Sequence, residues 1–185
     1  MEDHLHNEPK TLHDKVQAAI DKHTEADNIY LLYGHCGQAL CGVQARSCPV
    51  ILPKAEDCID VLLADNDQVA ELRHTAYFVS PGWLWGEENS GYEYDRIKAK
   101  HGEKRAMRVI RAMYKNYEHL LYINTGLDED RVRTECAQVA DKLGLELKET
   151  TGGVDVFLDM LAGAVDSRYL IILPGESITE DMFRK

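Results

Sequence analysis

The chain has 185 residues, of which 44% are hydrophobic and 29% are charged, and this length predicts a single domain over residues 1–185. Its formal net charge of -11 argues against a protein that binds nucleic acid or an anionic membrane surface. No apolar run approaches the roughly 20 residues that span a bilayer, residues 1–28 are polar, and the five cysteines do not suggest a disulfide framework, so we expect a cytoplasmic protein.

Apolar periodicity and turn residues predict helices and strands that alternate along the chain. In the first half we expect helices over residues 9–24, 38–46 (with Leu40 and Val43 inward) and 57–63, and strands over 29–33, 50–52 and 76–79. In the second half we expect a loop over 83–91, a long helix over about 94–117 with Gly102 as its candidate break, helices over 128–143 and 154–161, and strands over 120–124, 145–148 and 169–173. This alternation predicts an α/β fold with a three-layer, doubly wound, mostly parallel sheet.

Two segments of the chain, residues 58–63 and 153–158, have similar sequences, and each follows a short predicted strand. One interpretation is a pair of related βαβα halves that face each other across a cleft. The other is a coincidence between two amphipathic helices. Cysteine occurs only in the first of the two segments, so the halves would not be chemically equivalent.

Two cysteines follow two successive predicted strands. Cys36 comes directly after the strand over 29–33, and Cys58 comes six residues after the strand over 50–52. Because the carboxyl ends of parallel strands meet at one edge of a sheet, we expect the two thiols to lie close together. A helix that starts there would favour the thiolate form, so both cysteines are candidate metal ligands or nucleophiles. The competing interpretation is two small buried hydrophobic side chains.

Two thiols do not complete a metal site. Zinc takes four ligands, and a cubane cluster usually takes three or four cysteines. The nearest additional candidates are His35, Glu56 and Asp57, although neighbouring residues in a turn can point apart. We expect the remaining cysteines, Cys41, Cys48 and Cys136, to serve packing, and the chain contains no CxxC pair.

Glycine-containing turns allow a second kind of site, one for a small molecule or an anion. Residues 150–153 precede a predicted helix and could hold a phosphate or carboxylate through their amides. The residues that would line such a site are Gly34, His35, Gly37, Lys54, Asp57, Gly82, Trp83, Gly126, Gly152 and Gly153. A third hypothesis is an enzyme in which a helix N-terminus activates Cys36 as the nucleophile.

Several short motifs occur together in one order: LHNEP at 5–9, YGHCG at 33–37, PKAEDCI at 53–59, SPGW at 80–83, TGL at 125–127 and PGE at 174–176. In these motifs the chain resembles the domain of unknown function 1638 (DUF1638) family over nearly its whole length. Family members typically have arginine and histidine in place of Lys54 and Glu56, so a carboxylate stands where a histidine ligand would be. The family also begins earlier, with a strand that carries a further cysteine, so we expect one strand and one thiol to be missing here.

The resemblance implies a cytoplasmic protein that is often encoded near corrinoid-dependent methyltransferase systems. We therefore expect a cysteine-bound zinc ion or iron–sulfur cluster, with Cys36, Cys58 and Glu56 as the metal ligands and corrinoid methyltransferase components as partners. The acidic charge and the long predicted helix over 94–117 also permit a homodimer.

Overall fold

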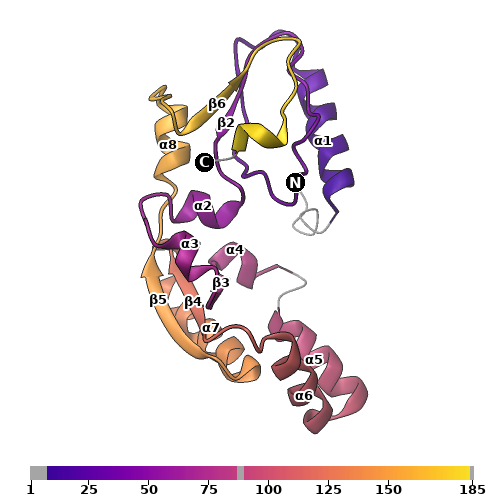
Figure 1. Ribbon diagram of the computed structural model, residues 1–185, viewed down its shortest axis with the longest axis vertical. Coiled ribbons are helices and arrows are strands. Elements are labelled where there is room, and N and C mark those ends of the chain that lie inside the picture. The colour runs from indigo at the N-terminus through magenta and orange to yellow at the C-terminus, as the bar shows by residue number, and fades with distance from the viewer. Residues whose placement is uncertain (1–7, 87–89, 184–185) are drawn as a thin grey trace. The chain divides into compact units, whose positions relative to one another are not determined.

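The computed structural model describes residues 8–86 and 90–183, and the chain divides into two compact units. Unit 1 consists of Met1–Val61 and Val154–Lys185, and unit 2 is Leu62–Gly153 (Figure 1). Each unit contains its own three-stranded sheet. Within the described ranges, no helix is both long enough and apolar enough to cross a membrane. The assignment of one domain over residues 1–185 stays a prediction.

Unit 1 is built around a mixed sheet in the order β1-β2-β6, with β1 parallel and β6 antiparallel to β2. Its elements are α1 (Pro9–Lys22), β1 (Ile29–Tyr30), β2 (Val50–Pro53), α2 (Cys58–Leu62), α8 (Asp155–Leu161), β6 (Tyr169–Ile172) and the short 3-10 helix η2 (Glu180–Phe183). Side chains alternate along β2, so Val50 and Leu52 pack with α1 while Ile51 packs with α8. Figure 1 shows these two helices on either side of the sheet.

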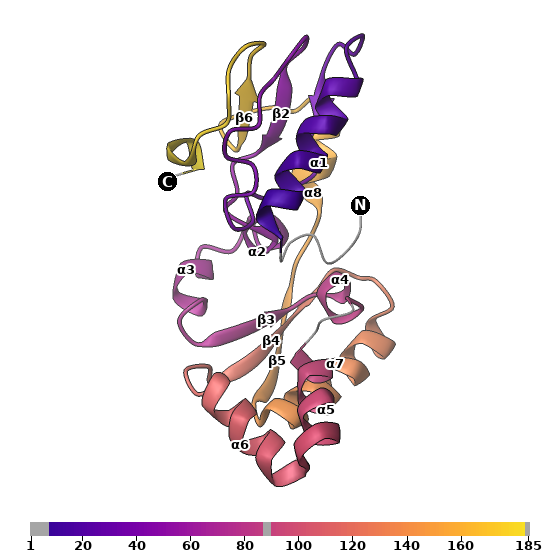
Figure 2. The same cartoon turned by 90° about the vertical axis from the view of Figure 1, so that its right-hand side faces the viewer.

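Unit 2 contains a fully parallel sheet in the order β3-β4-β5. Its elements are α3 (Val69–Leu72), β3 (Ala76–Val79), α4 (Pro81–Leu84), α5 (Ser90–His101), α6 (Glu103–Met113), β4 (His119–Asn124), α7 (Glu129–Leu143) and β5 (Glu146–Thr151). Leu120 and Tyr122 of β4 pack against Val132 and Cys136 of α7, and Figure 2 shows this helix beside the sheet.

The α/β fold class is confirmed, but the sheet differs from the predicted one. Two three-stranded sheets replace a single doubly wound sheet, and β6 is antiparallel. The strand over 76–79 has the predicted bounds. The predicted helix over 94–117 is instead two helices, because Gly102 has a φ of +79° and ends α5. The predicted loop over 83–91 overlaps α4 and α5, and its residues 87–89 lie outside the described part.

The predicted helix over 38–46 is wrong. The segment forms successive turns, in which Ala39, Cys41 and Val43 each donate an N–H to the carbonyl three residues earlier. Gln38 and Gly42 have φ values of +66° and +84°, which a right-handed helix does not allow. Leu40 and Val43 are nevertheless buried, as predicted, so the apolar pattern indicated burial and not helix.

The two similar segments both contribute helices to unit 1. Val61 of α2 and Val156 of α8 pack in the same apolar cluster, with Ile51 of β2. This arrangement does not favour two related halves, because the two segments are neighbours in one unit. A cleft between halves stays a prediction.

Candidate thiol site in unit 1

The turns that follow β1 and β2 stay paired after the strands end. Leu31 N–H donates to Ile51 O at 2.9 Å, His35 N–H to Ala55 O at 2.9 Å, and Cys36 N–H to Glu56 O at 2.8 Å. The two segments therefore stay hydrogen-bonded to each other beyond the strands, as far as Cys36. This bonding brings together the two turns that carry the predicted thiols.

Gly34 makes this close approach possible. A Cβ atom at this position would lie 2.5 Å from the Asp57 carbonyl carbon and 2.6 Å from its oxygen. No real Cβ comes so close to backbone, so only glycine allows the two chains to lie side by side here. The role of Gly34 is thus to bring the turns together, and it does not require contact with a ligand.

Cys36 lies at the start of α2, in contact with the residue that carries the second thiol. The Cys58 backbone N–H donates a hydrogen bond to Cys36 Sγ. Burial raises the pKa of the Cys36 thiol, while this hydrogen bond acts in the opposite direction and Asp57 adds to the increase. Cys36 also has a φ of +31°, an uncommon value for a residue with a side chain. The Cys58 residue is exposed.

Asp57 is the N-cap of α2. Its Oδ1 accepts the N–H of Ile59 at 2.9 Å and the N–H of Asp60 at 3.1 Å. Glu56 is exposed, and its N–H donates to Asp60 Oδ2 at 3.1 Å. Lys54 is half-buried and continues the pairing with β6, because its N–H donates to Arg168 O at 2.7 Å.

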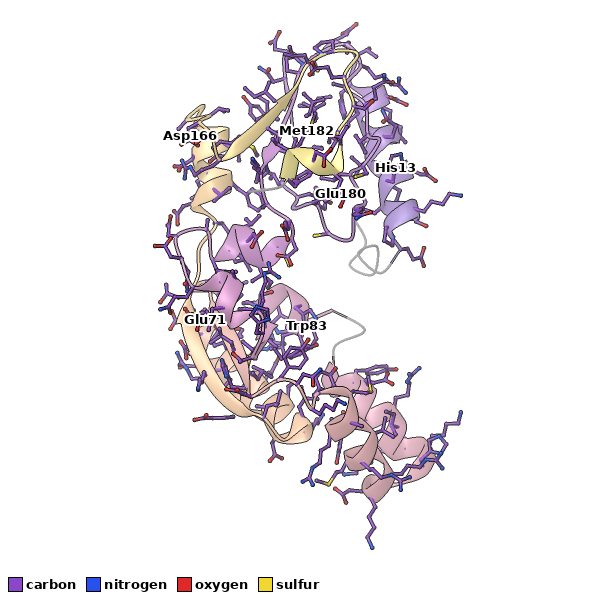
Figure 3. All side chains as sticks on the ribbon, in the orientation of Figure 1. His13, Glu71, Trp83, Asp166, Glu180 and Met182 are labelled. Carbon is purple, nitrogen blue, oxygen red and sulfur yellow. The ribbon has the colours of Figure 1, made fainter. Side chains whose placement is uncertain are left out.

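His35 faces a different cysteine from the two that the sequence indicates. Its ring is buried, stacks on Phe183 with centroids 4.1 Å apart, and places Nε2 3.6 Å from Cys41 Sγ. Burial lowers the pKa of His35, and Glu180 on η2, labelled in Figure 3, acts against this shift. Cys41 was expected to serve only packing, because the predicted helix would have turned it away from His35. A spacing of six residues does not by itself indicate that two side chains meet. The contact can be recognised only when the turns between His35 and Cys41 are known.

The helix expected directly after Cys36 does not form, because residues 36–42 form turns. Instead, the Cys36 sulfur accepts the N–H of Cys58, the first residue of α2, while burial raises the pKa of the thiol. The hypothesis of a nucleophilic Cys36 stays a prediction. Gly37, with a φ of +61°, belongs to these turns and lies near Pro9.

The predicted small-molecule residues of unit 2 gather at the carboxyl edge of its sheet. Gly82 and Trp83 follow β3 in α4, Gly126 follows β4, and Gly152 follows β5. Gly152 N–H donates to Asn124 O and Gly153 N–H to Leu62 O, both at 2.9 Å. Neither amide is left for an anion, so the amide cradle expected at residues 150–153 is wrong at these two positions.

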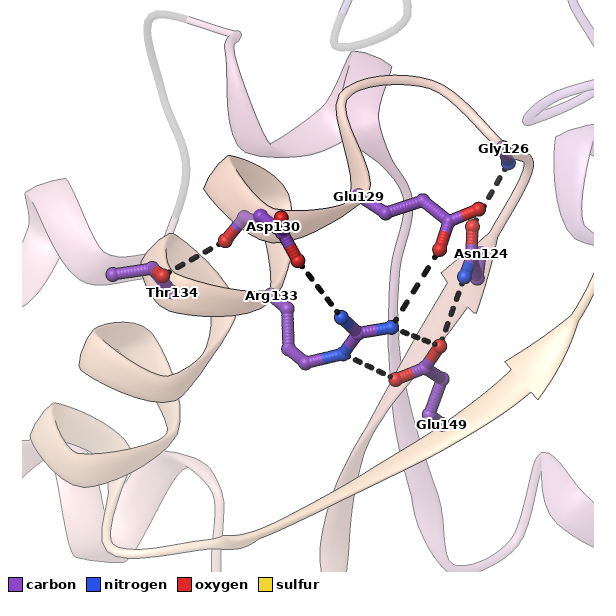
Figure 4. Close-up of polar contacts among 7 residues, drawn as sticks. All are labelled: Asn124, Gly126, Glu129, Asp130, Arg133, Thr134 and Glu149. Atoms are coloured by element: carbon purple, nitrogen blue, oxygen red, sulfur yellow. Dashed lines mark hydrogen bonds and ion pairs between the residues drawn. The ribbon is translucent and has the colours of Figure 1, made fainter.

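Side chains at the same edge form a closed polar network (Figure 4). Arg133 donates to both carboxylate oxygens of Glu149, at 2.9 and 3.0 Å, and lies 3.8 Å from Glu129. Asn124 donates to Glu149 at 2.9 Å and accepts the Gly126 N–H at 2.8 Å. Arg133 does not give this edge a net positive charge, because the carboxylates around the guanidinium group outnumber it. This charge balance disfavours an anionic ligand at the edge.

Comparison with known proteins places the chain in a family. The model of a family described as a protein of unknown function, DUF1638, matches residues 1–161. The chain belongs to the DUF1638 family. No curated protein and no solved structure matches it.

The described part of this DUF1638 protein contains no group of three or more His, Cys, Asp or Glu side chains placed to hold a metal ion. Cys36, Cys58 and Glu56 are all described, so these three predicted ligands do not form such a group. What unit 1 presents is a pair of cysteines at one sheet edge, with a carboxylate nearby in the sequence.

Proposed function

We propose that this DUF1638 protein binds a soft metal centre, a zinc ion or an iron–sulfur cluster, through the thiolates of Cys36 and Cys58. The observation that carries the proposal is the hydrogen bond from Cys58 N–H to Cys36 Sγ. Thiolates bind both kinds of centre, and this contact brings the two cysteines to one edge of a sheet.

The surroundings of the pair suit a metal centre. The amide of Cys58 stabilises the charged form of the Cys36 sulfur, as second-shell donors to metal-bound thiolates do. Cys58 is exposed, so a metal can reach the site from solvent. Gly34 and the Asp57 cap fix the backbone of both turns before any ligand binds.

A pair of thiolates leaves coordination positions for other groups. A tetrahedral zinc site with two protein ligands has two further positions, which water, a bound molecule, residues outside the described ranges or a second chain would fill. Glu56, two residues before Cys58 and exposed, is the carboxylate that we propose as a third ligand after a side-chain movement. A role beside corrinoid methyltransferase components is a further proposal, and it rests on the family resemblance alone.

Anaerobic titration with Co²⁺ tests the proposal, because thiolate ligands give cobalt an intense near-ultraviolet charge-transfer band. We expect this band in the unchanged protein and its loss in Cys36→Ser and Cys58→Ser. Cys41→Ser is the matched control, since Cys41 lies in the same turns but faces His35. Glu56→Gln should weaken binding while the band remains.

Reconstitution with iron and sulfide distinguishes the two metal centres, because a cluster gives broad visible absorption and zinc gives none. An unchanged protein that binds neither Co²⁺ nor iron would overturn the proposal. Equal cobalt bands in the unchanged protein and in Cys58→Ser would overturn the assignment of the pair.

A further inference from the structure

Positive charge is concentrated in one part of this acidic protein. Residues 96–115 contain eight Lys or Arg residues and a single Glu, which gives this stretch a formal net charge of +7, whereas the whole chain carries -11. The stretch covers the second half of α5 and all of α6. These two helices of unit 2 pack side by side (Figure 2).

On α6 the cations follow one face of the helix. Lys104, Arg108 and Arg111 are spaced by four and three residues, so they lie on the same side, one turn apart from each other. All three are exposed. The other side of the helix carries Ala106 and Ile110, which are buried in the core of unit 2. The positive face of α6 is therefore turned away from that core.

Lys115 extends this face just beyond the end of α6. It stands four residues after Arg111 and is exposed. These four residues, Lys104, Arg108, Arg111 and Lys115, are named the basic stripe. Within residues 8–86 and 90–183, none of their side chains has an ion-pair partner, whereas Lys98 on α5 lies 3.1 Å from Glu103. The basic stripe is thus left for a partner from outside these ranges.

The basic stripe weakens the helix that carries it, so folding does not explain its presence. Lys104 and Arg108, like Arg108 and Arg111, place equal charges at a spacing where side chains meet on a helix surface and repel. Lys104 also lies in the first turn of α6, where the helix dipole disfavours a cation. An anionic partner would remove these repulsions.

An exposed methionine beside the basic stripe distinguishes between anionic partners. Met107 is 38% exposed and lies three residues after Lys104 and four before Arg111, so it neighbours both on the helix surface. A thioether adapts to the apolar side chains of many protein partners, but it gives a phosphate backbone nothing to bind. The rest of the chain is acidic, which would repel a nucleic acid that extends past the stripe.

We propose that α6 is the docking site for an acidic, amphipathic helix of a partner protein. Its carboxylates would pair with the basic stripe, and an apolar side chain between them would cover Met107. From Lys104 to Arg111 the stripe spans about 10 Å, or two helical turns, so a partner helix with acidic residues at the same spacing matches it. The proposal goes beyond the metal site and does not depend on it, because all its residues belong to unit 2.

Fluorescence anisotropy with a labelled helical peptide tests the charge pairing. The peptide carries glutamates at the spacing of the basic stripe and leucines beside them. We expect the full chain to bind it, and the double variant Arg108→Gln with Arg111→Gln to raise the dissociation constant by about tenfold or more. The control is Lys10→Gln with Lys22→Gln, because both lysines are exposed on α1 and the charge changes equally. No binding, or equal weakening by both double variants, would overturn the proposal.

A second set of probes tests the class of the partner. Met107→Gln should weaken binding of the peptide severalfold and leave binding of a short DNA duplex and of phosphatidylglycerol vesicles unchanged. Met113→Gln is the control, because Met113 is 54% exposed but lies six residues further along, on another side of α6. A duplex or vesicles that bind more tightly than the peptide would overturn the protein partner, and so would a Met107→Gln variant that binds the peptide normally.

Discussion

The carboxyl edges of the two sheets differ in how their polar groups are used. In unit 2, Arg133, Glu149 and Asn124 bond to one another and close the edge after β4 and β5. In unit 1, the corresponding edge holds a thiol on a backbone amide and a second, exposed cysteine. Both edges lie at the carboxyl ends of parallel strands, which is where open α/β sheets bind ligands.

The difference teaches that position in the fold does not by itself make a site. At the unit 2 edge, the strongest donors and acceptors already satisfy each other, so a ligand would have to break ion pairs to bind. At the unit 1 edge, the Cys36 sulfur accepts an amide hydrogen bond, and as a thiolate it would have further lone pairs for a metal. We therefore place the candidate site in unit 1, although the predicted glycines are more numerous in unit 2.

The largest expected effect comes from Gly34→Ala, which tests whether the unit 1 edge depends on the close approach of its two turns. The added methyl would overlap the Asp57 backbone, so we expect a loss of about 3 kcal/mol in the free energy of unfolding, measured with urea. Gly82→Ala in unit 2 is the control, because a Cβ at this position would meet nothing within 4 Å beyond its chain neighbours and its own helix backbone. Equal stability of the two variants would show that the turns separate easily.

Each unit also buries one histidine in its described part, and the pH dependence of these two residues sharpens the comparison. His35 and His119 are both 6% exposed, and in both the Nδ1 lacks a hydrogen-bond partner among the described residues. Burial lowers the pKa of each; Glu180 and Glu56 oppose the shift at His35, and Glu118 and Glu146 oppose it at His119. At His119, Lys148 lowers the pKa further.

The lowered pKa values give a definite sign. The unfolded chain binds a proton on each histidine at about pH 6.5, before the folded protein does. Stability is therefore lost as the pH falls through about 6.5 toward the folded pKa, with a slope of at most about 1.4 kcal/mol per pH unit for each residue. Urea unfolding of His119→Asn and His35→Asn should each show a shallower slope. An unchanged slope in both would contradict the assignment.

Sequence patterns predict most elements of this protein but not the pairing of its strands. The β3 bounds and the end of α7 at Gly144 follow from local signals, an apolar run and a glycine with positive φ. The antiparallel direction of β6 does not follow from local signals, because the apolar run YLII carries no information on strand direction. Only tertiary contacts set that direction. For the same reason, local signals did not indicate that the strands form two sheets instead of one.

The candidate site was predictable to the same degree. That Cys36 and Cys58 follow neighbouring strands could be read from the chain, and the Asp57 cap could be read from its position before an apolar helix. That His35 faces Cys41 could not be read from the chain. The contact depends on the positive φ values of residues 36–38, which are not those of a helix. Side-chain direction within a turn is a three-dimensional property.

A smaller effect is expected from the two helix starts. Asp57 caps α2 with its side chain, whereas Asp128 precedes α7 without a side-chain cap bond. Asp57→Ala should therefore lower the free energy of unfolding by about 1 kcal/mol, and Asp57→Asn should restore most of it. Asp128→Asn is the control in unit 2, because asparagine tolerates the φ of +45° at this position, and little change is expected in the urea midpoint. A larger loss from Asp128→Asn than from Asp57→Ala would reverse the assignment of the two caps.

The smallest effect tests whether the unit 2 edge is closed by charge. Arg133→Gln removes the cation that faces Glu149, Glu129 and Asp130, so the carboxylates would repel and the urea midpoint should fall slightly. The fall should vanish in about 1 M salt, where screening acts over about 3 Å. Arg96→Gln, which loses an exposed ion pair with Glu93 on α5, should change nothing. If Arg133→Gln is also silent at low salt, the network does not hold the unit 2 edge closed, and that edge becomes as open to a ligand as the thiol edge of unit 1.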